Sequence, residues 1–411
     1  MSGDRSAPAT QRRRRLLAIS HPAVVNVNQE VYRELQRRGW EVTIVVPSRW
    51  RSEYSQRTMT PQPLAGLEHA LRPTPVALAG RPQRHFYLTR CRALSAGARP
   101  DVAFVEAEPY SISATQWGQV FTRQGIPFGV QCAENIDRAL PLPVRELRAR
   151  VLRRAAFVAA RSDSAARLAR AWGATGEVAL APHAVPEWEL APEEHHASAG
   201  ATQEADDLRD GAYPDHLRER SHPFDREGQP FTIGYAGRLV ESKGLTDLLA
   251  AVRMLDAPVE LLLIGDGELR AQLEGQPIPG SRVRVLDGVA HDGMASAYAR
   301  LDVLALPSRT TPTWKEQFGR VVVEALWCGL PVVGSDSGEI PWLIELTGGG
   351  LTFPEGDHAQ LAARLNELRA SPELCRRLTK SGRAAVERLF SVSAASDAFE
   401  RLLAGALQSE G

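Results

Sequence analysis

The chain has 411 residues, 43% of them hydrophobic and 24% charged, which is the composition of an ordinary globular protein with two or three domains. It contains no apolar stretch of the ~18 residues that a membrane helix needs. Arg12 to Arg15 form a basic run, but the apolar run Leu16–Ile19 that follows is shorter than the ~7 residues of a signal-peptide core. We therefore expect a basic tail leading into a first strand, and a cytoplasmic protein.

The net charge is zero, but the two halves differ in sign. Residues 1–190 hold 27 Arg and 16 Asp plus Glu, a net +11, and residues 191–411 hold 22 Lys plus Arg and 33 Asp plus Glu, a net −11. This asymmetry suggests that the first half faces something anionic. Lysine is rare, so Lys243, Lys315 and Lys380 are informative, because an ammonium is not interchangeable with a guanidinium. The four cysteines show no metal-ligand spacing and are expected to be reduced core residues.

Short apolar runs alternate with amphipathic segments along the chain, which predicts parallel sheets covered by helices. In the first half the helices include 29–38 and 164–172, and the expected strands are Leu16–Ser20, Val42–Val46, Val102–Val105, Phe128–Cys132, Phe157–Ala160 and Val178–Ala181. Residues 189–228 are rich in Glu, Asp, His and Pro and predict an exposed linker or insertion. A second series of expected strands then follows at Phe231–Tyr235, Val259–Ile264, Val283–Leu286, Val303–Leu306 and Val332–Ser335.

This order of elements predicts an α/β protein with two Rossmann-like, doubly wound parallel-sheet domains in tandem. We expect an amino-terminal domain at 1–188, the linker at 189–228, a second domain at 229–388 and a terminal helix at 389–411 that packs back toward the first domain. Ligands of such sheets bind beyond the carboxyl ends of the strands, so a cleft between the two domains is the expected site.

The first motif with chemical content lies where the second domain begins. Residues 234–239 read Gly-Tyr-Ala-Gly-Arg-Leu, and residues 241–244 read Glu-Ser-Lys-Gly, just before an expected helix. Glycines let the backbone approach a ligand, and the cations Arg238 and Lys243 beside a helix start can hold the two phosphates of a diphosphate. The same two side chains would also be unremarkable as solvated surface charges.

The second motif is a pair of glutamates, Glu316 and Glu324, separated by seven residues that include Phe318 and Gly319. If a helix starts near Gly319, Glu316 lies in the loop above its first turn and Glu324 about 12 Å further along. That separation suits two carboxylates that grip opposite ends of a nucleotide-sugar, with its diphosphate at the helix start. In the alternative interpretation Glu324 is a solvated helix residue, but its apolar neighbours indicate burial, where an unpaired carboxylate is costly.

These motifs resemble those of glycosyltransferase family four, whose members are retaining enzymes with the GT-B fold. The resemblance runs through most of residues 231–357. Its ordered matches are the Gly-Arg-Leu and Lys-Gly loop, Ile264–Gly267, Asp302 with Pro307 and Ser308, the two-glutamate motif, Gly329–Val333, Ser335–Pro341, and Gly350 to Pro354.

The resemblance implies roles for individual residues. Arg238 and Lys243 would bind the donor diphosphate, Glu316 the hydroxyls of the donor sugar, and Glu324 the ribose. Further donor contacts fall on Gly237, Val289 (beside the base), Phe318, Gly319 and, as an added cation, Lys315. Arg238, Lys243 and Glu316 would carry the catalysis.

The first half matches less well, and its acceptor-side residues are correspondingly less defined. The resembled family usually has a glycine pair after the first strand, where the donor phosphate meets this domain. Residues 24–28 read Val-Val-Asn-Val-Asn here, so Asn28 could donate a hydrogen bond to that phosphate instead. Glu108, in Glu-Pro-Tyr, and Asn135 resemble a bacterial subgroup associated with envelope or exopolysaccharide sugars. His183 replaces part of the family's junction motif and is read as a hinge residue in preference to a catalyst.

We interpret the sequence as that of a glycosyltransferase that moves a hexosyl group from a UDP- or GDP-sugar to an acceptor hydroxyl, with the retention of configuration that the resemblance implies. The chain contains no Asp-x-Asp pair, so we expect fixed cations in place of a metal, and no cofactor. Rival interpretations are a non-catalytic nucleotide-sugar-binding protein and an epimerase or phosphorylase of the same architecture. The acceptor would be a saccharide, a lipid-linked sugar or a small molecule, and no nucleic acid is expected.

The basic charge of the first half is concentrated in one expected helix. Five arginines fall within ten residues, and Val144, Leu147, Val151 and Leu152 recur at helical spacing; the arginines are Arg145, Arg148, Arg150, Arg153 and Arg154. The helix is either an ordinary solvated one or a face that rests on an anionic membrane, which would make the protein peripheral at the inner face of that membrane.

Overall fold

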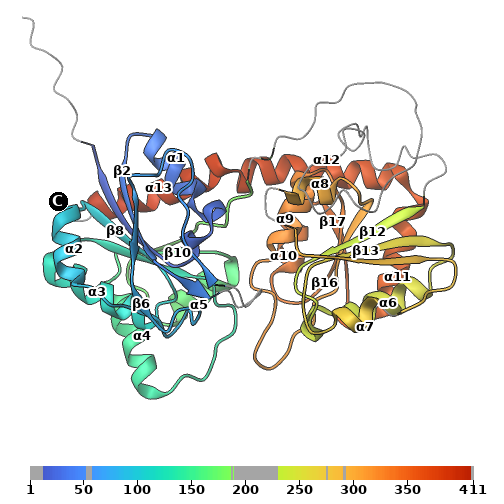
Figure 1. Ribbon diagram of the computed structural model, residues 1–411, viewed down its shortest axis with the longest axis horizontal. Coiled ribbons are helices and arrows are strands. Elements are labelled where there is room, and N and C mark those ends of the chain that lie inside the picture. Colours follow the sequence, from blue (N-terminus) through green and yellow to red (C-terminus); the bar gives the residue numbers. More distant parts are fainter. Residues whose placement is uncertain are drawn as a thin grey trace, which may run out of the picture.

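The computed structural model describes residues 13–51, 58–186, 188, 230–274, 276–289 and 293–408. Two α/β lobes lie side by side, each with one parallel sheet between layers of helices (Figure 1). The expected fold class is therefore confirmed. The expected linker at 189–228 and the first twelve residues of the basic tail lie outside the described residues.

The amino-terminal lobe is built on a seven-stranded sheet with the order β11-β10-β9-β8-β1-β2-β5. Its strands are β1 (Arg15–Ser20), β2 (Glu41–Pro47), β5 (Leu71–Thr74), β8 (Val102–Glu106), β9 (Phe128–Cys132), β10 (Phe157–Ala160) and β11 (Glu177–Leu180). The inner strands β8, β9 and β10 are buried along their whole length, as a parallel sheet covered on both faces requires. The edge strand β5 was not predicted, because Arg72 and Pro73 interrupt its apolar character.

Five helices from the first half of the chain cover this sheet among the described residues: α1 (Glu30–Arg37), α2 (Cys91–Ala98), α3 (Ile112–Gln124), α4 (Leu142–Arg154) and α5 (Asp163–Ala171). Two of them begin at a serine that caps the helix. The Ser111 and Ser162 side chains accept hydrogen bonds from the N–H groups of Ala114 and Ala165, which satisfies donors that the first turn leaves free. Two short antiparallel pairs complete the lobe: β3 (Trp50–Arg51) with β4 (Thr58–Met59), and β6 (Val76–Ala77) with β7 (Phe86–Tyr87).

The second lobe has a six-stranded sheet with the order β14-β13-β12-β15-β16-β17. Its strands are β12 (Phe231–Ala236), β13 (Val259–Ile264), β14 (Arg282–Leu286), β15 (Val303–Leu306), β16 (Val332–Ser335) and β17 (Gly350–Phe353). Its helices are α6 (Leu245–Arg253), α7 (Arg270–Glu274), α8 (Met294–Tyr298), α9 (Arg320–Trp327), α10 (Ile340–Thr347) and α11 (His358–Ala370). In both sheets the strand order reverses beside the first strand, β1 or β12, and a ligand crevice opens at such a reversal.

Two long helices join the lobes at the end of the chain. Helix α12 (Pro372–Phe390) packs on the second lobe, and α13 (Val392–Gln408) crosses to lie against α1 of the first (Figure 1). The Phe399, Leu402 and Leu403 side chains of α13 belong to the core of the amino-terminal lobe. A hydrogen bond of 2.8 Å from the Val185 N–H to the Phe390 carbonyl ties the two places where the chain passes between the lobes.

Candidate functional site

Glycines shape the loop that follows β12. Gly237 has φ +146°, and a Cβ on neighbouring Gly265 would lie 1.9 Å from the Gly237 carbonyl oxygen, so the two loops can pack only without side chains there. The Tyr235 hydroxyl donates to the Arg238 carbonyl at 2.7 Å and holds the turn. The Arg238 side chain, half-buried, lines an open depression of about 600 Å³ together with Ser242 and other residues of the same region.

Lys243 and Glu316, predicted to bind different parts of one ligand, contact each other. Lys243 Nζ lies 2.6 Å from Glu316 Oε2, and their side chains are only 13% and 12% exposed. The Ser308 hydroxyl donates to the same carboxylate oxygen at 3.1 Å, and Lys243 Nζ lies 4.5 Å from the centre of the Trp314 ring. Neither Ser308 nor Trp314 was predicted to act here. Ser308 belongs to one of the matched motifs, whereas Trp314 lies two residues before the two-glutamate motif, outside any match.

Helix α9 begins at Arg320, with Gly319 as its cap in the left-handed conformation at φ +73°. Glu316 therefore lies in the loop before the helix and Glu324 inside it, in the arrangement that the spacing predicted. Glu324 is only 4% exposed, which excludes its reading as a solvated helix residue. Burial raises the pKa of Glu324, although Arg320 and the Tyr298 hydroxyl act to lower it.

Both carboxylate oxygens of Glu324 are already held. The Tyr298 hydroxyl donates to Oε2 at 2.9 Å, and Arg320 Nε lies 3.2 Å from Oε1. Tyr298 escaped sequence analysis because it lies on another helix, α8, 26 residues away. Arg320 could have been found, since it precedes Glu324 by four residues on one helix face.

Three other predicted donor residues lie around this helix. Phe318 is buried and packs edge-on against the His183 and Phe390 rings, so its side chain serves the junction between the lobes. Val289 follows β14 and packs against the core of the second lobe. Lys315 lies beside Glu316 in the loop before α9.

The predicted acceptor-side residues Asn28 and Asn135 both reach across to the second lobe. Asn135 Nδ2 donates to the Glu316 carbonyl at 2.7 Å, and the Asn28 side-chain oxygen accepts from Arg320 Nη1 at 3.1 Å. Asn28 Nδ2, expected to serve a ligand phosphate, donates to the Pro22 carbonyl at 2.8 Å. The carboxyl ends of the two sheets therefore face each other across this boundary.

Glu108 lies at the end of β8 on the first lobe's side of the boundary. It is buried, its Oε1 accepts from the Ala133 N–H at 2.7 Å, and its Oε2 has no hydrogen-bond partner among the described residues. Burial raises the pKa of Glu108 to about 8, and the nearby Glu134 carboxylate adds to this rise. Glu108 is thus a neutral carboxylic acid over most of the neutral pH range.

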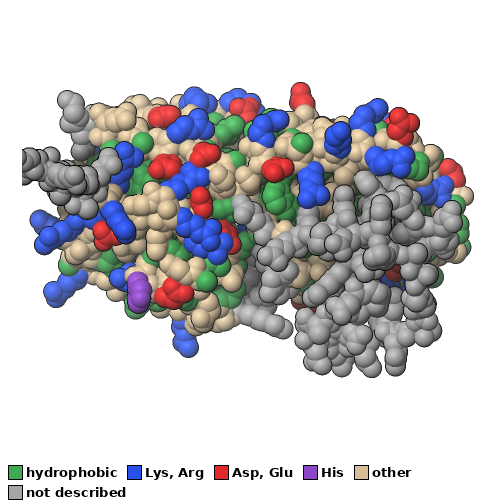
Figure 2. Space-filling model, turned by 90° about the horizontal axis from the view of Figure 1, so that it is seen from above, with side chains coloured by type: hydrophobic (Ala, Val, Ile, Leu, Met, Phe, Trp, Pro, Cys, Tyr) green, Lys and Arg blue, Asp and Glu red, His purple; other side chains and the backbone are tan. Residues whose placement is uncertain are grey.

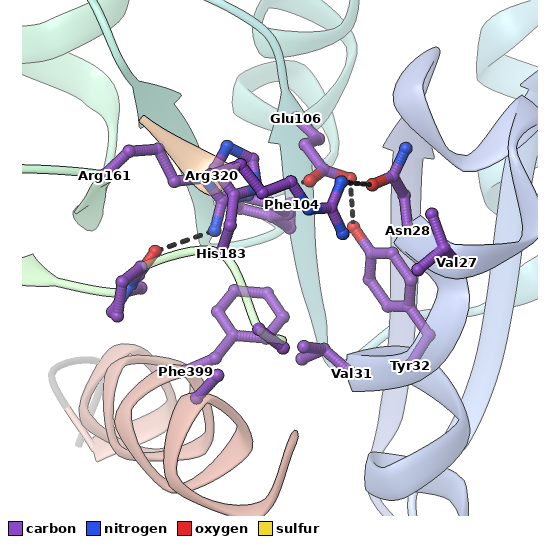
Figure 3. A pocket seen from close by; sticks show the side chains of 14 residues that line it. Val27, Asn28, Val31, Tyr32, Phe104, Glu106, Arg161, His183, Arg320 and Phe399 are labelled. Carbon is purple, nitrogen blue, oxygen red and sulfur yellow. Dashed lines mark hydrogen bonds and ion pairs between the residues drawn. The ribbon is translucent and has the colours of Figure 1, made fainter. Parts of the chain in front are cut away.

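A small cavity of about 40 Å³ lies between the lobes behind these contacts (Figure 3). Arg320 enters it from α9, whereas Asn28, Tyr32, Glu106 and Arg161 come from the first lobe. Arg161 Nη2 and Glu106 Oε1 form a buried ion pair of 2.7 Å, and the Tyr32 hydroxyl donates to the other Glu106 oxygen at 2.8 Å. His183 also lines the cavity, and burial lowers the pKa of this histidine well below its ordinary value.

The basic helix α4 differs from its prediction at one position. Arg148 is buried, and its guanidinium stacks over the Trp172 ring at 4.1 Å from the ring centre, because a planar cation can cover an aromatic face. Arg145, Arg150, Arg153 and Arg154 remain exposed. On another face of the molecule, seen from above in Figure 2, basic and acidic side chains are interspersed.

No group of three or more His, Cys, Asp or Glu side chains among the described residues is placed to hold a metal ion. No described helix is long and apolar enough to cross a membrane.

The two halves of the chain match two family models. Residues 23–183 match a glycosyl transferase 4-like domain, and residues 218–385 match glycosyl transferases group 1. The second half of the chain therefore carries a group 1 glycosyltransferase domain, and the first half a glycosyl transferase 4-like domain. The resemblance to this glycosyltransferase family, which was inferred from the sequence motifs, is therefore confirmed.

Similar proteins include bacterial glycosyltransferases. An amylovoran biosynthesis glycosyltransferase of Erwinia amylovora is 35% identical over 34% of this chain and 36% of its own length. A lipopolysaccharide core biosynthesis glycosyltransferase of Rhizobium meliloti is 32% identical over 41% of this chain and 48% of its own length. The chain thus matches between a third and a half of these relatives.

Solved structures with the same fold cover nearly the whole chain. A sucrose-phosphate synthase of Thermosynechococcus elongatus has a TM-score of 0.67 at 18% identity, covering 97% of this chain and all of that one. HepE of Anabaena, solved in complex with UDP, has a TM-score of 0.65 at 16% identity, covering 96% of this chain and all of that one. At such identities the likeness shows the GT-B fold.

Proposed function

We propose that this protein transfers a hexosyl group from a UDP- or GDP-sugar to an acceptor hydroxyl, with retained configuration, in envelope or exopolysaccharide synthesis. The observation that carries the proposal is the meeting of Lys243, Glu316 and the start of α9 at one edge of the second sheet, with Glu324 buried about one turn into that helix. The Anabaena neighbour's complex with UDP supports a uridine donor, and the names of the relatives support a polysaccharide product.

The ion pair between Lys243 and Glu316 holds both side chains ready for the donor. On binding, the donor phosphate would take the ammonium and the sugar hydroxyls would take the carboxylate, so that neither charge stays buried without a partner. The bond between the anomeric carbon and the diphosphate then breaks while the acceptor oxygen attacks the same face. The leaving diphosphate gains negative charge, which Arg238, Lys243 and the helix start at Gly319 stabilise. A donor phosphate oxygen accepts the proton of the acceptor hydroxyl.

The rival functions make different predictions for one assay. Arg238→Ala and Lys243→Ala should each lower transfer from the donor by at least about 100-fold, the loss typical for one preorganised charge in a reaction site. Donor binding without turnover in the wild-type protein would favour the non-catalytic binder, and interconversion of the free nucleotide-sugar would favour the epimerase. Near-normal turnover in either variant would refute the catalytic assignment. Activity that persists after chelation would support cations in place of a metal.

We further propose a lipid-linked acceptor and peripheral contact with an anionic membrane at the cytoplasmic face. The supporting observation is the group of four exposed arginines on α4 that begins just after the exposed Leu142. Each such basic residue contributes ~1 kcal/mol of attraction near an anionic surface. In a vesicle co-sedimentation assay, binding to anionic and not neutral lipid, reversed by salt, is expected. Charge reversal of Arg150 and Arg153 should abolish it, and equal binding to both lipids would contradict the proposal.

A further inference from the structure

The loop after β1 makes its contact with the second lobe through a side chain. Asn28 lies in this loop, and its Oδ1 accepts a 3.1 Å hydrogen bond from Arg320 Nη1. Its Nδ2 donates to the Pro22 carbonyl at 2.8 Å, which aims the oxygen at the second lobe (Figure 3). The amide is therefore oriented as an acceptor for a cation.

Arg320 is the first residue of α9 and makes two contacts of different kinds. Its Nε lies 3.2 Å from Glu324 Oε1 on its own helix, and its Nη1 reaches Asn28 on the other lobe. The contact with Asn28 is a hydrogen bond, whereas the contact with Glu324 is an ion pair in which Nε has no hydrogen-bond partner among the described residues. One guanidinium thus contacts both residues, because its nitrogens lie in one rigid plane. Tyr298 holds the second oxygen of Glu324 at 2.9 Å, so the Arg320 contact decides how the remaining oxygen is presented.

We propose that Arg320 is a positioning residue that couples the nucleotide grip of Glu324 to closure of the cleft through Asn28. The inference rests on the proposed function, in which Glu324 binds the ribose. With the lobes closed, Asn28 restrains the Arg320 guanidinium, which in turn fixes the Glu324 carboxylate. With the lobes open, Arg320 loses its contact with Asn28 and is restrained by Glu324 alone. The nucleotide should therefore bind the closed form more tightly, and a ligand with that preference shifts the population toward it.

Substitutions of Asn28 separate this role from a direct contact with the donor phosphate. Asp keeps an acceptor for Arg320, whereas Leu removes it at similar volume. If Asn28 served only Arg320, Asn28→Asp should bind the nucleoside diphosphate within about twofold of the wild type and Asn28→Leu several-fold more weakly. If Asn28 donated to a phosphate instead, the carboxylate would repel the diphosphate and Asn28→Asp would be the weaker binder.

Substitutions of Arg320 test the coupling itself. Arg320→Gln should raise the dissociation constant of UDP or GDP, and the KM for the donor, by about tenfold, with a smaller effect on kcat. The dissociation constant of Arg320→Lys should fall between those of the wild type and Arg320→Gln, because one ammonium cannot hold both Asn28 and Glu324 in the same geometry. The double variant Arg320→Gln with Asn28→Leu should be no worse than Arg320→Gln alone, since both remove one coupled contact. Arg377→Gln, on the exposed side of α12, is the matched control.

Calorimetry with UDP and GDP, together with hydrogen exchange of residues 22–29, distinguishes the outcomes. Additive effects of the two substitutions, unchanged binding in Arg320→Gln, or an Asn28→Asp variant weaker than Asn28→Leu would each overturn the coupling. A wild-type protein that binds no nucleotide would overturn the proposed function instead. In that case the coupling can still be measured by hydrogen exchange in the protein without ligand. Arg320→Gln should speed hydrogen exchange at residues 22–29, and an unchanged exchange rate would refute the coupling.

Discussion

Glu108 shows how burial at one residue translates into a measurable property of the whole chain. Its pKa is raised to about 8 from 4.5, so the folded protein keeps a proton that the unfolded chain has released between those values. Its contribution to the free energy of unfolding must therefore fall as the pH rises through this window, by at most ~1.4 kcal/mol per pH unit.

Replacing Glu108 by Gln should remove that slope, because the amide stays neutral. Urea unfolding of both proteins from pH 4 to pH 9 measures it, and the difference between them cancels the other titrating groups. Relative to the wild type, the variant should gain stability steadily as the pH rises from about 5 to 8. Parallel pH profiles would show that Glu108 ionises normally in the folded state.

Substitution of the two glutamates of the donor motif should impair different steps of the reaction. Glu324→Gln should weaken binding of the free nucleoside diphosphate, because its proposed partner is the ribose, whereas Glu316→Gln should mainly slow transfer. Calorimetry with UDP and GDP, set beside single-turnover rates, separates the two effects. Undiminished nucleotide binding by Glu324→Gln would exclude the ribose role.

At the residue scale, the sequence predicted where the two glutamates lie relative to a helix, but not which side chains contact them. The spacing of Glu316 and Glu324 placed both correctly relative to α9, since a helical rise is regular. Their partners Lys243 and Tyr298 lie 73 and 26 residues away, and only the packing of separate loops and helices brings them together. No local pattern carries that information.

At the scale of elements, the position of a loop depends on glycines that have no room for a side chain. Gly244 has φ +68°, and a Cβ there would lie 1.8 Å from the Pro307 carbonyl oxygen. Gly173, after α5, has φ +93° with nothing within 4 Å of the corresponding Cβ. The two positions share backbone strain and differ in crowding.

Gly244→Ala should therefore lower stability by more than backbone strain alone would, because the new Cβ also clashes with the Pro307 carbonyl. That clash should displace the neighbouring Lys243. We expect at least about 100-fold lower transfer activity, whereas Gly173→Ala should lose about 1 kcal/mol of stability and keep its activity. Thermal unfolding and donor turnover of both variants provide the comparison. Equal losses in the two would mean that the contact with Pro307 is relieved at little cost.

Most strands of both sheets were predictable because buried parallel strands are continuous apolar runs bounded by turns. The exceptions are informative. The edge strands β5 and β17 carry proline, arginine or glycine, since an edge makes fewer demands on its residues. The expected strand at 178–181 lies one residue earlier, a difference within the usual uncertainty of boundaries.

For the whole molecule, the sequence predicted two tandem lobes and a terminal helix that packs back toward the first lobe, but it did not identify the side chains that make this contact. Phe399 of α13 packs against Phe104 of β8, with ring centres 4.7 Å apart, and is buried in the first lobe's core. Arg38 and Trp40 of the same lobe bind Glu400, the next residue of that helix. The carboxyl-terminal helix is thus a structural part of the amino-terminal lobe.

Phe399→Ala should destabilise the first lobe by roughly 3–5 kcal/mol, the usual cost of emptying a buried aromatic site. Hydrogen exchange should speed up in β8 and β10, far away in sequence, and less in the second lobe. Leu346→Ala, at a position that is 40% exposed, is the control and should be nearly neutral. Loss of protection confined to α12 and α13 would contradict this dependence.

The return of α13 also has a consequence for how the protein is made. Strand β10 leaves the ribosome more than two hundred residues before α13, yet its hydrophobic face is covered partly by Phe399. Domains usually fold in the order of their synthesis. Here the lobe that emerges first must wait, with part of its core exposed, while the second lobe is translated and folds. The first lobe is completed only after the second, which makes the interval between them the period of greatest exposure to chaperones and to aggregation.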